Sequence, residues 1–134
     1  MNQNEIESYV AGLPNVQHSE NFGYAFYFYG DDHRLPFLTT ANSDNDYDNV
    51  SNLSREGVFR INLGVTKATF SRLVPNPDAS DIDYTVLNTF LPHPDYAKQH
   101  FICILNPLGE NIATLKSLIQ EAWEIAKTRN ERKS

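Results

Sequence analysis

The sequence predicts a single α+β domain, in which a twisted, mainly antiparallel sheet carries the helices of both chain ends on one face. Three observations support this fold class. Residues 58–65 alternate apolar and polar side chains with the period of two of a half-buried strand. Residues 23–41 contain two strand-like segments around a turn-rich connection, which is typical of a hairpin. Residues 111–129 repeat apolar side chains at helical spacing. Hairpins with few crossover connections favour an antiparallel sheet with helices on one face.

An amphipathic helix is expected near the N-terminus, where apolar side chains recur at helical spacing over residues 6–13. Asn2 or Asn4 can cap its first turn, and Gly12 ends it. The residues that follow, 15–21, are polar, and we interpret them as a linker.

A hairpin should follow this linker. Residues 22–29 hold six aromatic side chains in eight positions, with rings on both faces of an extended chain. This pattern predicts a strand covered on both sides, or one whose second face lines a groove. Residues 30–34 form turns, and residues 37–41 supply the second strand. The connection is longer than a tight two-residue hairpin loop.

The central strand of the sheet is predicted over residues 58–65. Its apolar side chains share one face, which we expect to lie beneath the terminal helices, and its polar positions share the other. The core-facing residues are Phe59, Ile61, Leu63 and Val65, and the opposite face presents Arg60, Asn62 and Gly64.

The second half of the chain continues the sheet and ends in a helix. Thr66 is the expected cap of a helix over residues 67–74. Residues 84–91 fit either a strand or a helical turn. Residues 99–105 are almost all apolar and predict a buried strand, and residues 111–129 predict the C-terminal helix.

Composition limits the class of protein. At 134 residues and 40% apolar side chains, the chain is long enough for one globular domain and too apolar for disorder. No apolar run approaches the roughly 20 residues of a membrane span, and residues 1–5 lack the basic and apolar features of a secretory signal. The single cysteine, Cys103, rules out an internal disulfide. We therefore expect a cytoplasmic protein without membrane contact.

Charge argues against a nucleic-acid partner. The net charge is −6, and residues 1–115 contain 6 basic against 14 acidic side chains. Nucleic-acid binding normally needs a basic stripe, because neutralised phosphates supply most of the non-specific affinity. Only the tail, about residues 127–134, is basic, and basic side chains there also complement the dipole of a C-terminal helix.

Arg60 and Asn62 are the candidate ligand-binding pair. They share the polar face of the central strand, and we expect Tyr27 and Tyr29 of the hairpin to lie beside them. A guanidinium flanked by rings and a side-chain amide can bind a small anionic or planar ligand. The competing interpretation is an ordinary solvated sheet face.

His93 is the candidate catalytic residue, with Asp95 or Tyr96 as its acid–base partner. It lies between two prolines, which fix the backbone and aim the imidazole, although a structural turn explains the same pattern. His100 is expected to pack beside the apolar residues of its strand.

Metal and thiol chemistry fit the sequence poorly. Asp44, Asp46 and Asp48 have the spacing that opens a calcium loop, but the glycine and the glutamate that complete that motif are missing. No recognised zinc spacing occurs. Cys103 has apolar neighbours on both sides, which is typical of a buried, unreactive thiol. We predict neither a metal nor a cofactor.

Several short segments resemble a known group. These are residues 46–48, 57–65, 83–85, 91–96 and 103–107. In this combination the chain resembles the MmcQ/YjbR-like small bacterial proteins and, more closely, a related domain-of-unknown-function family. The resemblance implies a YjbR-like or frataxin-like fold, also called double-wing.

Some relatives in that group have been suggested to bind DNA. Here Asp31 and Asp32 occupy the hairpin turn where a DNA-binding wing would carry basic residues. Phe101 also stands where the YjbR-like pattern has tryptophan.

Taken together, the sequence predicts a small-ligand-binding or regulatory interaction module. The alternative is a small enzyme that uses His93 with Asp95 or Tyr96. A DNA-binding module is the third possibility, and the charge disfavours it.

Overall fold

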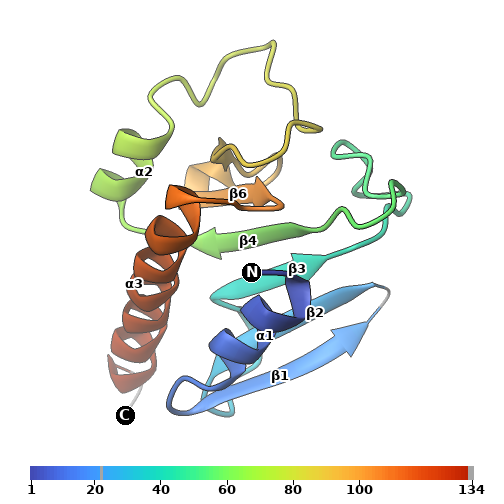
Figure 1. Cartoon of the computed structure of the whole chain (residues 1–134). Coiled ribbons are helices and arrows are strands. Elements are labelled where there is room, and N and C mark those ends of the chain that lie inside the picture. The colour runs from blue at the N-terminus through green and yellow to red at the C-terminus, as the bar shows by residue number, and fades with distance from the viewer. Residues whose placement is uncertain (22, 133–134) are drawn as a thin grey trace.

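The computed structural model describes residues 1–21 and 23–132. The chain forms one six-stranded sheet in the order β1-β2-β3-β4-β6-β5, with every neighbouring pair antiparallel (Figure 1). This confirms the predicted α+β class. In chain order the elements are α1 (Gln3–Ala11), β1 (Val16–Asn21), β2 (Tyr24–Tyr29), β3 (Leu38–Ala41), β4 (Arg60–Gly64), α2 (Lys67–Leu73), β5 (Leu91–Pro92), a 3₁₀ turn η1 (Ala97–Gln99), β6 (Phe101–Leu105) and α3 (Glu110–Arg132).

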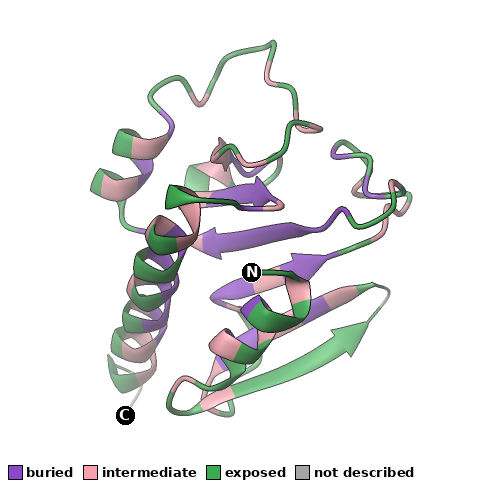
Figure 2. Cartoon of the chain, in the orientation of Figure 1, coloured by how far each residue is buried: buried purple, intermediate pink, exposed green. Residues whose placement is uncertain are grey.

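The main core lies between the sheet and the helices. Cross-strand partners share a face of an antiparallel sheet, so the pairs Ile61–Ile104 and Leu63–Ile102 place four buried side chains on the helix side. Figure 2 shows β4 and β6 as the most completely buried strands. The helices contribute Ile6 and Val10 from α1, Phe70 from α2, and Leu115, Leu118, Ile119, Ala122, Trp123 and Ala126 from α3.

The helix caps follow the sequence. Asn2 and Glu5 form a capping box, in which each side chain accepts a hydrogen bond from the other residue's backbone N–H (2.8 and 2.9 Å). Thr66 caps α2 by accepting from the backbone N–H of Thr69 at 3.2 Å. The predicted helix ends at Gly12 and Val74 are also observed.

The expected linker at residues 15–21 is wrong, because Val16–Asn21 form β1 at the edge of the sheet. Five of its six residues are exposed, so no apolar alternation marks the strand. Its register against β2 is continuous from Val16–Tyr29 to Asn21–Tyr24, and backbone hydrogen bonds hold it there. Phe22, which the sequence assigned to the next strand, lies outside the described residues.

Residues 84–91 form neither a helix nor a strand, apart from Leu91 at the start of the two-residue β5. Polar contacts hold the segment instead. Asp83 accepts from the backbone N–H and the hydroxyl of Thr85, and the backbone N–H of Asn88 donates to the carbonyl of Leu105 at 2.6 Å. Within residues 1–21 and 23–132, no helix is long and apolar enough to cross a membrane.

Over the central strand β4, the second face of the sheet is covered by loops. Leu53 and Val58, from the loop between β3 and β4, pack on Ala41 and Leu105 in a second apolar cluster. Arg60 and Asn62 lie on this same face and are 0% and 2% exposed. The polar side of the central strand is therefore a second interior layer.

Candidate functional site

Arg60 lies at the centre of a buried polar cluster, called here the Arg60 cluster, which also contains Asp48, Ser51, Asn62 and Tyr24. The guanidinium donates to both carboxylate oxygens of Asp48, with Nη1 to Oδ1 at 3.0 Å. Its Nε donates to Oδ1 of Asn62 at 2.9 Å, and Nη1 also donates to the hydroxyl of Ser51 at 2.9 Å. The anion bound by Arg60 is thus the chain's own Asp48 carboxylate.

The Arg60 cluster shifts the pKa values of its members. Burial alone would raise the pKa of Asp48, but hydrogen bonds from Arg60 and Tyr24 and the charge of Arg60 outweigh burial and lower it. Tyr24 donates its hydroxyl to Asp48. Burial, together with that carboxylate, raises the pKa of Tyr24 to about 12. The cluster therefore holds an ionised aspartate, an arginine and a neutral tyrosine at ordinary pH.

The expected grouping of Arg60 and Asn62 with Tyr27 and Tyr29 is corrected by the register of the strands. Tyr27 pairs with Leu38, which pairs with Leu63 on the helix face. Tyr29 lies two residues on and shares that face. Tyr24, which pairs with Ala41 beside Arg60, is the aromatic residue of the Arg60 cluster. Aromatic residues occupy both faces of β2, so the residue pattern alone does not indicate which of them lie beside Arg60.

His93 is buried, at 7% exposure, and caps a turn. Its Nδ1 accepts from the backbone N–H groups of Asp95 and Tyr96 at 3.0 and 3.1 Å, so the neutral ring carries its proton on Nε2. Burial, aided by the charge of Arg60, lowers the pKa of His93 to about 4. A neutral imidazole whose Nδ1 is engaged has no free site for accepting a proton near neutral pH.

The positions of Asp95 and Tyr96, the two expected partners of His93, do not support acid–base catalysis. Asp95 and Tyr96 are exposed, and their contacts with the imidazole nitrogens come from backbone N–H groups. The ring of Tyr96 packs near that of His93, with centroids 5.0 Å apart. These contacts of His93 hold the turn after β5.

Cys103 is 0% exposed, and burial raises the pKa of its thiol to about 12.

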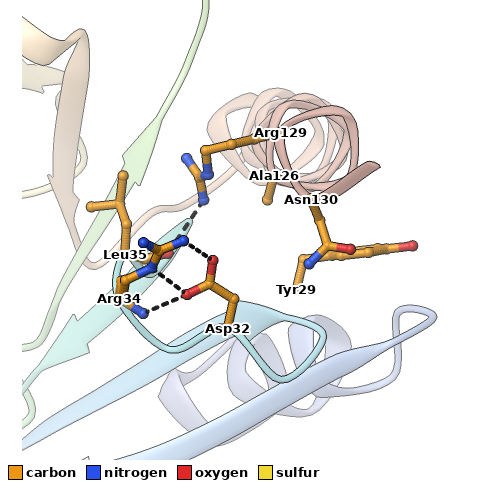
Figure 3. A pocket seen from close by; sticks show the side chains of 7 residues that line it. All are labelled: Tyr29, Asp32, Arg34, Leu35, Ala126, Arg129 and Asn130. Atoms are coloured by element: carbon orange, nitrogen blue, oxygen red, sulfur yellow. Dashed lines mark hydrogen bonds and ion pairs between the residues drawn. The ribbon is translucent and has the colours of Figure 1, made fainter. Parts of the chain in front are cut away.

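A surface pocket of about 320 Å³ brings together the connection after β2 and the last turns of α3 (Figure 3). It is called here the Arg34–Arg129 pocket. Its two arginines approach from segments that are distant in sequence, and sequence reasoning found only Tyr29 among its residues. The lining residues are Tyr29, Asp32, Arg34, Leu35, Ala126, Arg129 and Asn130.

The arginines of this pocket are held in different ways. Arg34 donates from Nε and Nη2 to the two oxygens of Asp32, both at 3.0 Å, in a fork that fixes the guanidinium plane. Arg129 reaches from α3 across the pocket, and its Nη2 donates to the carbonyl of Leu35 at 3.3 Å (Figure 3). Burial lowers the pKa of Arg129 from its usual value, although the group stays charged.

The Tyr29 side of the pocket is built from packed and hydrogen-bonded side chains. The ring of Tyr29 meets Trp123 edge-on, with centroids 5.6 Å apart, and its hydroxyl accepts from Nδ2 of Asn15 at 3.1 Å. Trp123 in turn donates from Nε1 to the carbonyl of Pro14 at 2.8 Å. The pocket is therefore preformed on one side by packed rings and on the other by an ion-paired arginine.

A wider hollow of about 640 Å³ lies between the start of α1 and residues 53–59. Its arginine, Arg55, donates to the carbonyls of Ser51, Asn52 and Thr85 and braces two loops. That engagement makes it a weaker candidate for binding an anion.

Comparison with known proteins places the chain in a family. A model described as "Family of unknown function (DUF6194)" matches residues 1–134. The chain belongs to this family. That agrees with the expected domain-of-unknown-function family, whereas the link to MmcQ/YjbR-like proteins stays a prediction.

One solved structure shares the DUF6194 chain's fold. It is a protein from Pseudomonas syringae determined by the Northeast Structural Genomics Consortium, with a TM-score of 0.60 and 17% identity over 94% of this chain and 99% of that one. At that identity the likeness concerns the fold alone. No curated protein matches the DUF6194 chain.

Proposed function

We propose that this DUF6194 chain is a small-ligand-binding module, and that its ligand places a carboxylate or phosphate group in the Arg34–Arg129 pocket. The observation that carries the proposal is the meeting of two guanidinium groups, from the loop after β2 and from α3, in one hollow of about 320 Å³. The chain has a net charge of −6, so two arginines against one lining aspartate form a local reversal of charge.

Arg129 is the better placed group for direct contact with an anion. A guanidinium has five N–H donors, and the structure gives one of Arg129's a protein acceptor, the carbonyl of Leu35. The side chain is partly buried, so water solvates it less than it would a fully exposed arginine. An anion that occupies the remaining donors restores favourable charge-assisted hydrogen bonds.

Arg34 supplies the second contact from the exposed rim of the pocket, where its side chain is paired with Asp32. Asp32 engages its Nε and one Nη2 donor, which leaves the Nη1 edge for a ligand. Because the Asp32 fork already restricts the side chain, binding costs less conformational entropy than it would for a free arginine. The two guanidinium groups together can clamp one carboxylate or phosphate.

The other lining residues limit the rest of the ligand. Tyr29, Leu35 and Ala126 offer apolar surface, and Asn130 adds an amide. A pocket near the lower end of the usual size range for small-molecule sites fits a compact molecule. We therefore expect a small anion with a planar or apolar part.

The proposal can be tested by isothermal titration calorimetry with inorganic phosphate, citrate and benzoate, in buffers matched for ionic strength with chloride. We expect at least one of these probes to bind, and to raise the melting temperature at saturating concentration by mass action. Arg129→Gln and Arg34→Gln should each weaken binding by about tenfold or more, since charge-assisted hydrogen bonds contribute roughly 1.5–3 kcal/mol.

Arg132→Gln is the matched control, because Arg132 lies on the same helix and is exposed, and it does not line the pocket. It removes the same charge and should retain wild-type affinity. If all three variants lose affinity equally, the effect is general electrostatics and the proposed site is wrong. The same conclusion follows if none of the probes binds the wild-type chain.

A further inference from the structure

The two edges of the sheet differ in how they face solvent. One edge is β5, which has two residues, Leu91 and Pro92, and so offers little backbone for pairing. The other edge is β1, which is six residues long and exposed over five of them. Figure 2 shows this strand coloured almost throughout as exposed. Its register with β2 is continuous, without a bulge. It contains neither proline nor lysine, two residues with which proteins commonly block an edge.

The outward backbone groups of β1 can be identified from its neighbours. The N–H of Gly30 donates to the carbonyl of Asn15 at 2.6 Å, so Asn15 faces the β2 side of the strand. Backbone direction alternates along a strand, so Val16, His18 and Glu20 turn their N–H and C=O groups away from β2. In the described part of the chain, these outward groups have no hydrogen-bonding partner.

We infer that β1 pairs antiparallel with β1 of a second copy of this chain, about a two-fold axis at Ser19. The two chains would then form one continuous sheet, with both helical layers on the same side. Such isologous strand addition satisfies the outward groups of both edges at once. The inference does not depend on the anion site.

Charge and hydrogen bonding select this register. Only even-numbered residues of β1 turn their backbone groups outward, and these must pair with even-numbered residues of the second copy. The two-fold axis must therefore pass at a residue of β1 and not between two residues. Centring on Ser19 sets His18 opposite Glu20 twice and Gln17 opposite Asn21. Centring on Gln17 or Asn21 pairs at most three residues of β1, against five for Ser19. Centring on His18 sets two imidazoles against each other, and centring on Glu20 sets two carboxylates together, which destabilises a sheet pair.

The register makes a geometric prediction for crosslinking. Ser19 pairs with its own copy at a non-hydrogen-bonded position, where Cα atoms lie about 4.5 Å apart. That separation is within the range of a disulfide. Gln17 lies on the same strand face, but its own copy would be four positions away along the strand, which is too far for a disulfide. Cys103 is 0% exposed and should not compete.

The test compares Ser19→Cys with Gln17→Cys under mild oxidation, followed by non-reducing electrophoresis. We expect a covalent dimer from Ser19→Cys at least tenfold faster than from Gln17→Cys. In the Ser19→Cys background, His18→Pro removes an outward N–H and should slow crosslinking without loss of folding by circular dichroism. Equal rates for the two cysteine variants, no dimer from Ser19→Cys, or an unaffected rate in a folded His18→Pro variant would each overturn the inference.

Wild-type protein provides a measurement without any crosslink. A single strand pair is smaller than the interface of a stable dimer, so the association should be weak. Sedimentation equilibrium should show a reversible dimer that Glu20→Lys, which sets a cation opposite His18, weakens. A monomer at every concentration that also fails to crosslink contradicts the inference.

Discussion

Asp48 forms an ion pair with Arg60, the buried arginine of the central strand. This pair connects the loop between β3 and β4 to that strand. The two residues are 12 positions apart in sequence, and Arg60 contacts both carboxylate oxygens while its side chain is 0% exposed. Removing one partner of such a pair leaves the other charge buried without compensation, and this strongly destabilises the folded state.

Asp48→Asn should destabilise the fold by about 3 kcal/mol, because the change keeps the shape of the side chain but leaves Arg60 without its counter-charge. Urea unfolding monitored by circular dichroism measures this loss. Asp46→Asn is the control, since Asp46 is an exposed residue of the same loop. Equal midpoints for the two variants would contradict the structural role of the ion pair.

The pH dependence of stability should show two separate windows. The pKa of His93 in the folded chain is about 4, below the value of about 6.5 expected when unfolded, so its contribution is present above pH 6.5 and is lost as the pH falls towards 4. Asp48 also has a lowered pKa, so its contribution is lost only on further acidification, below about pH 4.

His93→Asn isolates the first window. An asparagine oxygen can take the place of Nδ1 and accept from the backbone N–H groups of Asp95 and Tyr96, but it does not titrate. The variant should fold and should lose a pH-dependent term on the order of 3 kcal/mol between pH 6.5 and 4. His33→Asn, at an exposed histidine hydrogen-bonded to Gln17 away from the Arg60 cluster, is the matched imidazole-to-amide control. An unchanged slope in His93→Asn would refute the buried neutral imidazole.

Tyr24 should ionise late. Its pKa is raised to about 12, so folded protein should retain the contribution of its neutral phenol below about pH 10 and lose it between pH 10 and 12. Ultraviolet titration of Tyr24→Phe, compared with wild type, should remove one high-pH transition. Tyr47→Phe, at a side chain 96% exposed, is the control for removing one phenol from the chain. If Tyr24→Phe leaves every high-pH transition of the wild type in place, the hydrogen bond between Tyr24 and Asp48 is contradicted.

Cys103 should not react in the native state. Its thiol is buried and its pKa is raised to about 12, so the reactive thiolate is scarce. A chromogenic disulfide reagent should label it only as fast as the chain unfolds, and at once in strong denaturant. Labelling of native protein at the rate of a free thiol would contradict the burial of Cys103 in β6.

Periodicity predicted the elements that bury an apolar face. Residues 111–129 and 58–65 carry their signal within a single segment, and both the C-terminal helix and the central strand are observed. The residue pattern does not predict β1, because its side chains are mostly exposed and the strand is defined by backbone pairing with β2. Local sequence carries little trace of such a strand.

The polar sites depended on contacts that periodicity does not encode. The strand pattern around Arg60 predicts a site for an anionic or planar ligand, but the path of the loop that carries Asp48 to Arg60 is tertiary information. The pattern also predicts Tyr29 beside Arg60, whereas the structure places Tyr29 in the pocket of Arg34 and Arg129. That pocket joins segments 94 positions apart, as the bond from Arg129 to Leu35 shows.

Chemical-shift mapping during a phosphate or citrate titration tests the central claim most directly, because it locates the bound anion. We expect the largest amide shifts at residues 29–35 and 126–130, with a smaller change in the indole N–H of Trp123, the chain's one tryptophan. These shifts should shrink in Arg129→Gln and persist in Arg132→Gln. Shifts centred on any other surface, or no shift with either anion, would contradict binding in the Arg34–Arg129 pocket.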